Sequence, residues 1–136
     1  MKINTSIQSF IISSFLLGIF SCGQARNGAL IVADCDTIKM PTIDLSVTQV
    51  GEYDLKLSNQ GNEELSVNDI KVSCDCVDAQ PRQCVIPPKG KATIHIKISI
   101  GGSIPTTYEK TIGIYSNDSL HNPLVLPLVG KSDYLK

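Results

Sequence analysis

The sequence lacks tryptophan and is poor in aromatic and charged residues. Aromatic residues make up 5% and charged residues 18% of its 136 residues, and the formal net charge is −1. An average soluble protein has about 25% charged residues. Because a nucleic-acid-binding surface needs a concentration of basic residues, we expect no nucleic-acid partner for this chain.

The patterns that mark common catalytic sites are also missing from the sequence. It has two histidines, His95 in a predicted strand and His121 in a predicted turn, and it has no G-x-S-x-G nucleophile motif. The pair Gly101-Gly102 lacks the spacing of a phosphate-binding loop. We therefore predict that the protein is not an enzyme and needs no cofactor.

The only long apolar run lies near the amino terminus, over residues 10–20, and follows Lys2. As a helix this run would span about 16 Å, about half of a bilayer core, so it predicts a secretory signal peptide over residues 1–21. The end of the run, Gly-Ile-Phe-Ser-Cys22, resembles a bacterial lipobox. An ordinary signal peptide with a chance cysteine is the alternative interpretation.

The lipobox resemblance implies that Cys22 carries diacylglycerol and fatty acyl chains such as palmitate. Several acyl chains on one residue hold a protein stably on a membrane. No acidic pair follows Cys22, which favours a periplasm-facing protein over a surface-exposed one. We expect a lipoprotein of a Gram-negative cell envelope, anchored to the outer membrane.

Five cysteines in a short exported chain indicate disulfides. If Cys22 is lipidated, the remaining four can pair in three ways. A bond between Cys76 and Cys84 closes a short loop that would contribute about 2–3 kcal/mol, and we favour it, with Cys74–Cys84 next. A Cys74–Cys76 bond would close a very small ring. Cys35 could pair with Cys74 only if its segment folds back.

A thiol redox site or a copper(I) site is the alternative role for these cysteines. Cys74, Cys76 and Cys84 could supply three thiolates, with His95 or Cys35 as a fourth ligand, and soft copper(I) suits such a set. Structural zinc sites space paired cysteines by more than one residue. The aspartate between Cys74 and Cys76 disfavours thiolate formation by charge repulsion.

Apolar and polar residues alternate through most of the chain after residue 40. Ile94, Ile96 and Ile98, for example, alternate with polar residues, which is typical of half-buried strands. Glycine, proline and asparagine separate the alternating segments. The pattern predicts an all-β protein, an Ig-like antiparallel β-sandwich of about seven strands. The expected strands cover residues 41–47, 50–58, 64–74, 84–86, 91–99, 107–116 and 123–130.

The parity of the apolar residues changes within the third expected strand. This change predicts a β-bulge near Asn68-Asp69. The expected division of the chain is a signal peptide (1–21), a tether (22–39), the sandwich domain (40–131) and a short tail (132–136).

Several short motifs occur in an order that resembles a known bacterial family. They are Asn59-Gln-Gly61, Ser73-Cys-Asp-Cys76, Pro88-Lys-Gly90 and Ser116-Asn-Asp118. The order resembles the domain of unknown function 1573 over roughly residues 50–131. The resemblance implies an immunoglobulin-type sandwich related to the ciliary and major-sperm-protein group. It implies no activity.

These expectations together favour a membrane-anchored interaction or scaffolding domain without catalysis. Sandwiches with an exposed edge strand commonly bind partners by strand addition, so we expect another envelope protein or peptide as the partner. Two Asp-Ser/Thr-aliphatic triplets resemble the site that some Gram-negative gut bacteria O-glycosylate. The resemblance implies O-glycosylation at Thr37 and Ser119.

Overall fold

The alternating segments form strands whose apolar side chains point into one core. In β8 (Lys91–Ser99), Ile94, Ile96 and Ile98 are almost fully buried, and the polar residues between them are exposed. The computed structural model describes residues 27–136. Its other strands are β1 (Ile31–Ala33), β2 (Ile38–Lys39), β3 (Ile43–Asp44), β4 (Val50–Asn59), β5 (Leu65–Val72), β6 (Val77–Gln80), β7 (Cys84–Ile86), β9 (Thr106–Ser116) and β10 (Leu124–Asp133).

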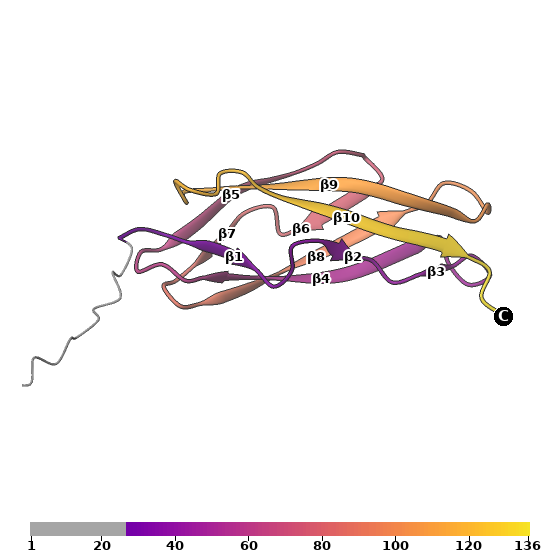
Figure 1. Ribbon diagram of the computed structural model, residues 1–136, viewed down its shortest axis with the longest axis horizontal. Helices are drawn as coiled ribbons and strands as arrows, with labels where there is room; N and C mark the ends of the chain where they lie inside the picture. Colours follow the sequence, from indigo (N-terminus) through magenta and orange to yellow (C-terminus); the bar gives the residue numbers. More distant parts are fainter. Residues whose placement is uncertain (1–26) are drawn as a thin grey trace, which may run out of the picture.

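These strands build two sheets that pack face to face, as Figure 1 shows. The first sheet has the order β1-β4-β8-β6, and the second has the order β2-β10-β9-β5-β7, with β3 also paired to β10. The core between them consists of isoleucine, leucine and valine side chains from both sheets. The predicted all-β, Ig-like sandwich is confirmed.

The first three strands of the described chain contribute to both sheets. β1 pairs antiparallel with β4 in the first sheet, whereas β2 and β3 pair parallel with β10 in the second. The chain therefore changes sheets between residues 33 and 38. The expected tether over residues 22–39 is corrected here for residues 31–39, which belong to the sandwich.

The remaining strands largely follow the sequence pattern. The predicted bulge is confirmed, since the register of β5 against β9 shifts between Val67 and Asp69. β6 was not expected, because only two residues separate it from the end of the third predicted strand (64–74). It pairs with β8 in the first sheet, so residues 73–76 form a crossover between the two sheets.

Candidate functional site

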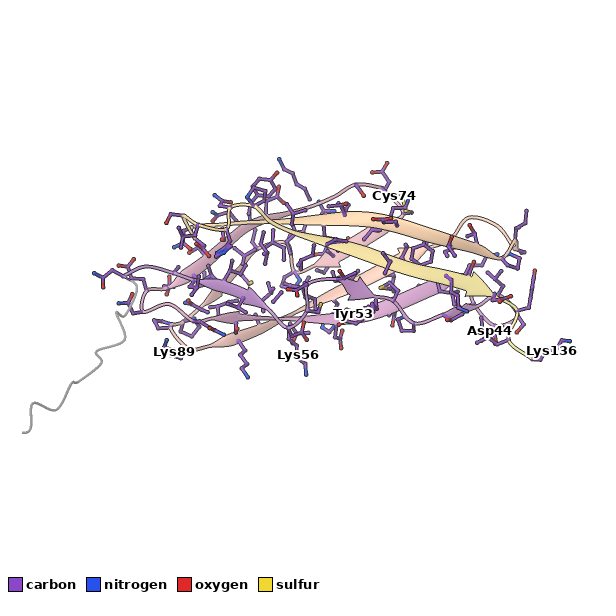
Figure 2. The ribbon with its side chains drawn as sticks, in the orientation of Figure 1. Asp44, Tyr53, Lys56, Cys74, Lys89 and Lys136 are labelled. Carbon is purple, nitrogen blue, oxygen red and sulfur yellow. A yellow bond between two sulfur atoms is a disulfide. The ribbon has the colours of Figure 1, made fainter. Side chains whose placement is uncertain are left out.

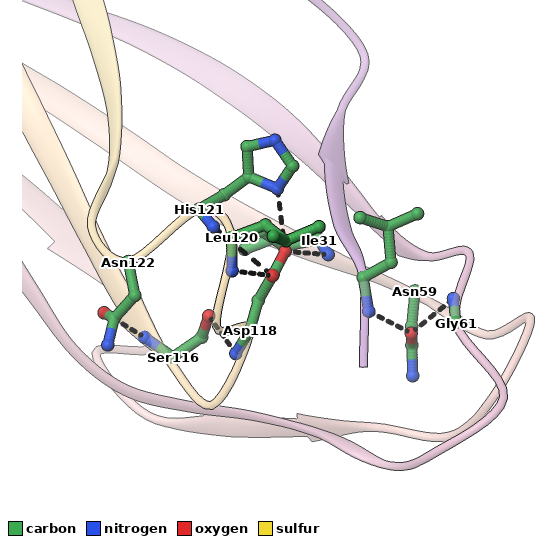
Figure 3. Close-up of polar contacts among 9 residues, drawn as sticks. Ile31, Asn59, Gly61, Ser116, Asp118, Leu120, His121 and Asn122 are labelled. Carbon is green, nitrogen blue, oxygen red and sulfur yellow. Dashed lines mark hydrogen bonds and ion pairs between the residues drawn. The ribbon is translucent and has the colours of Figure 1, made fainter. Parts of the chain in front are cut away.

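Asp118 is buried at one end of the sandwich, in the loop between β9 and β10 (Figure 3). Its Oδ2 accepts hydrogen bonds from the Ile31 N–H (3.0 Å) and from His121 Nδ1 (3.0 Å). Its Oδ1 accepts from the N–H groups of Leu120 (2.8 Å) and His121 (3.3 Å). One carboxylate thus joins β1 to a loop 87 residues later in the chain.

Asn59, at the end of β4, also joins separate backbone segments through its side chain, and it is fully buried. Its Oδ1 accepts from the N–H groups of Leu30 (3.2 Å) and Gly61 (3.0 Å), as Figure 3 shows for Asn59 and Gly61. Its Nδ2 donates to the carbonyl groups of Glu63 (2.7 Å) and Ile86 (3.0 Å). All the hydrogen-bonding capacity of this amide is used.

Asn117 completes this group, which we call the polar clamp (Asn59, Asn117 and Asp118). Its side chain accepts from the Ser66 N–H and donates to the Glu64 carbonyl, each at 2.9 Å. A Cβ on Gly61 would lie 2.1 Å from the Gly28 carbonyl oxygen, so only glycine fits there. The side chains of the N-x-G and S-N-D motifs therefore hold backbone segments together.

The long strand β4 is only partly covered at its outer edge. β1 pairs with Leu57–Asn59, and the Asp34 N–H donates to the Lys56 carbonyl at 3.0 Å. Beyond this point, residues 50–55 have a partner only in β8. In an antiparallel ladder, alternate residues direct their backbone groups to the same side. The Lys56 carbonyl points to the side of β4 that β1 covers. The backbone groups of Glu52 and Asp54 point to the same side, where no strand covers them, and we call this part of β4 the open edge.

A hollow of about 420 Å³ lies beside the open edge, where the chain changes sheets. The Tyr53 hydroxyl lies 3.9 Å from the Cys35 Sγ, and Figure 2 shows Tyr53 and Lys56 on the first sheet. Burial raises the pKa of the Cys35 thiol, so this group remains protonated near neutral pH. The hollow is lined by Cys35, Asp36, Thr37, Lys39 and Tyr53.

The solvent-facing side of β4 and β8 carries paired polar side chains. Lys97 Nζ lies 3.1 Å from Glu52 Oε1, and His95 Nδ1 contacts Asp54 Oδ1. The predicted outward position of His95 is confirmed by its exposed side chain. The residues beside His95 are Asp54 on β4 and Gln80 on β6, and neither is a cysteine. His95 is therefore not placed to join the proposed metal ligands.

The cysteine pairing that we favoured from the sequence differs from the observed one. A disulfide joins Cys74 and Cys76, and Cys84 and Cys35 are free. β7 runs back along β5, so that Cys84 lies opposite Val67. Along a strand this is roughly 20 Å from Cys74. Neither Cys76–Cys84 nor Cys74–Cys84 can form in this topology.

The same placement separates the three thiols of the copper(I) hypothesis. Among residues 27–136, no three histidine, cysteine or acidic residues lie close enough together to hold a metal ion. Burial raises the pKa of the Cys84 thiol, which packs against the core. Cys22, the predicted lipidation site, lies outside the described residues.

The two predicted glycosylation positions differ in accessibility. Ser119 is exposed in the β9–β10 loop, while Thr37 is half-buried between β1 and β2. Modification at either position stays a prediction. In the part of the chain that the structure describes, no helix is long and apolar enough to cross a membrane.

Comparison with known proteins gives a family and a fold. The sequence model of the family described as "Protein of unknown function (DUF1573)" matches residues 31–132. A search of curated proteins finds no match.

Several solved structures share the fold at low sequence identity. A protein of unknown function from Porphyromonas gingivalis W83 has a TM-score of 0.66 at 15% identity, covering 83% of this chain and 51% of that one. The present chain thus spans about half of its length. The seventh PapD-like domain of human CEP192 has a TM-score of 0.54 at 15% identity (78% and 87% covered). The Escherichia coli chaperone DraB has a TM-score of 0.58 at 9% identity (79% and 57% covered).

Proposed function

This chain belongs to the DUF1573 family, and from that membership and its sandwich fold we propose that it is a non-catalytic, lipid-anchored interaction protein of the bacterial cell envelope. Its partner is another envelope protein or a peptide, which adds an extended strand to the open edge of β4. Among the similar structures are periplasmic chaperones, which supports a protein-binding role. The lipobox-like segment ending at Cys22 supports the anchor.

The open edge of β4 is the observation that carries this proposal. Unpaired N–H and C=O groups at a sheet edge offer a template for another strand, and strand addition takes its affinity from these main-chain groups. The Val50 N–H donates to Thr48 Oγ1, so the free stretch covers residues 51–55, or about 17 Å at the rise of a strand. The neighbouring hollow, lined by Tyr53 and Cys35, offers space for one side chain of the incoming segment.

A proline at Asp54 tests the main-chain part of this interaction. It removes the N–H that points to the open edge, and proline is tolerated at such edge positions. With a photoreactive amino acid in place of Lys56, irradiation of intact cells is expected to give a discrete cross-linked product. Asp54→Pro should reduce this product at least tenfold, measured by immunoblot and identified by mass spectrometry.

Asp54→Ala is the matched control, since it removes the same carboxylate but keeps the N–H. The product should persist in this variant, and circular dichroism should show that both variants are folded. A product unaffected by the proline would contradict strand addition at β4. So would the same product from a photoreactive residue in place of Lys71, which is exposed on the second sheet.

The lipid anchor is tested separately by Cys22→Ser. The intact mass of the membrane-extracted wild type should include the acyl chains, and Cys22→Ser should lack them, because the diacylglycerol is attached through the cysteine sulfur. A wild type without the acyl mass would contradict this part of the proposal and leave the test at β4 unaffected.

A further inference from the structure

The Cys74–Cys76 disulfide closes a loop in which one residue separates the two cysteines. The stabilisation that a disulfide gives through the unfolded chain decreases as the loop becomes shorter, so this bond constrains the chain very little. Backbone hydrogen bonds hold the same segment without it. The Val77 N–H donates to the Cys74 carbonyl (3.0 Å), and the Ser99 N–H donates to the Cys76 carbonyl (2.8 Å).

The segment before the disulfide is fixed in the same way. The Ser73 N–H donates to the Thr111 carbonyl (3.0 Å), and the Thr111 N–H donates to the Ser73 Oγ (2.9 Å). Both flanks of the disulfide are thus tied to neighbouring strands, one in each sheet. None of these hydrogen bonds involves a sulfur atom, so we expect them to remain when the S–S bond is broken.

The disulfide lies at the crossover between the sheets (Figure 2, Cys74). Cys74 and Cys76 are half-buried, and Cys76 lines a hollow of about 180 Å³. Two isoleucines, Ile98 and Ile100, give this hollow an apolar wall, and Lys110 supplies one cationic side chain at its lining. A reacting thiol can therefore approach Cys76 from this hollow.

The two sulfur atoms have different surroundings. The Cys76 N–H donates to the Cys74 Sγ at 3.1 Å. A hydrogen bond to sulfur favours its charged form, so this N–H stabilises Cys74 when it leaves as a thiolate. It opposes the repulsion from the Asp75 carboxylate, which is exposed and therefore screened by solvent. Of the two cysteines, Cys76 is the residue that packs against the core and lines the hollow. Attack at Cys76 with departure of Cys74 is the favoured direction of exchange.

From this arrangement we propose that Cys74–Cys76 is a reversible thiol–disulfide exchange site that oxidises a dithiol of another protein. A thiolate of the partner attacks the Cys76 Sγ, the S–S bond breaks, and Cys74 leaves as a thiolate. The partner's second thiolate then attacks the partner's first sulfur atom, which is bonded to Cys76 in the mixed disulfide. This attack releases Cys76 as a thiolate. The partner loses two electrons and two protons and gains a disulfide, while Cys74 and Cys76 take them up as two thiols. This function is independent of the β4 edge.

The first test is native reduction of the full chain with dithiothreitol, followed by reoxidation with oxidised glutathione. Alkylation and peptide mapping should show Cys74 and Cys76 becoming reduced together and re-forming their bond. Circular dichroism should be unchanged, and the Tm should fall by less than about 10 °C. A disulfide that resists excess dithiothreitol until the protein unfolds would overturn the proposal, as would unfolding on reduction.

The second test compares thiol reactivities at pH 7 in the reduced chain. Cys74 should react with iodoacetamide at least tenfold faster than Cys84, because the thiolate is the reacting species and burial raises the pKa of Cys84. Cys76→Ser keeps the backbone N–H and should preserve the fast reaction of Cys74. Equal rates for Cys74 and Cys84 in the reduced wild type would overturn the proposal, whether or not the variant folds.

Lys110 gives a further readout with a matched control. Lys110→Gln should slow the attack of glutathione on the disulfide several-fold, because it removes a positive charge near the incoming thiolate. Lys97→Gln removes an equivalent charge from the outer face of β8, where Lys97 pairs with Glu52, and should leave the rate unchanged. Equal slowing by both variants, or by neither, would count against the hollow as the route of attack.

Discussion

Replacement of Asp118 by asparagine is expected to lower the free energy of unfolding by about 3 kcal/mol or more. Both carboxylate oxygens accept two hydrogen bonds in the folded protein. The amide of asparagine has a single acceptor oxygen, and its NH₂ group would face the two donors on the other side. The side chain is buried, so water cannot take the place of the lost bonds. Urea unfolding followed by circular dichroism measures the difference.

The same substitution should reduce the acid sensitivity of the protein. Burial alone would raise the pKa of Asp118, but hydrogen bonds from Ile31, Leu120 and His121 outweigh it and hold the pKa below its ordinary value. A lowered pKa means that the stabilisation is complete above the unfolded-state value of about 4 and is lost as pH falls through the folded-state value. Asp118→Asn should therefore lose less stability between neutral pH and pH 3 than the wild type.

Ser119→Ala is the control for this loop, because Ser119 is the exposed neighbour of Asp118. It should leave the free energy of unfolding within about 0.5 kcal/mol of the wild type. Hydrogen exchange at the Ile31 amide should accelerate in Asp118→Asn, since this N–H loses its acceptor. A wild-type unfolding curve for Asp118→Asn would contradict the role assigned to the polar clamp.

Asn59→Asp is the second substitution with a large expected effect, again about 3 kcal/mol or more. It preserves the shape of the side chain and the oxygen that accepts from Leu30 and Gly61. The new oxygen, however, would face the carbonyl groups of Glu63 and Ile86, which now receive hydrogen bonds from Nδ2. Thermal and urea unfolding should both show the loss.

Gln60→Ala provides the comparison for Asn59, because Gln60 is the next residue and its side chain is exposed. Its backbone N–H donates to the Leu30 carbonyl, and this bond is kept in the alanine variant. The expected change is within about 0.5 kcal/mol. If Asn59→Asp and Gln60→Ala gave the same stability, the four bonds of Asn59 would not be stabilising the fold.

Strand periodicity was sufficient to predict the long strands, because long alternating segments leave one interpretation. β8 has three inward isoleucines and was predicted with its observed bounds. β1 and β2 have three and two residues, too few to show a period, and they depend on pairing with distant strands. The predicted tether therefore extended to residue 39, although residues 31–39 belong to the sandwich.

The cysteines show why residue spacing did not predict the site. The observed bond depends on a crossover in which β6 joins the first sheet and β7 returns to pair with the start of β5. Local spacing carries no information on that route. The clamp motifs were visible in the sequence, but their purpose rests on contacts such as Ile31 with Asp118, which only the folded chain brings together.

The position of the polar clamp also determines how the domain responds to tension. The described chain begins at the end of the sandwich where the clamp lies and finishes at the opposite end (Figure 1). A pull outward on the segment before β1 runs along the strand axis. It therefore loads the β1–β4 hydrogen bonds and the Ile31–Asp118 bond in shear, so that they share the force. A domain pulled in this direction resists unfolding, because no single hydrogen bond breaks before the others.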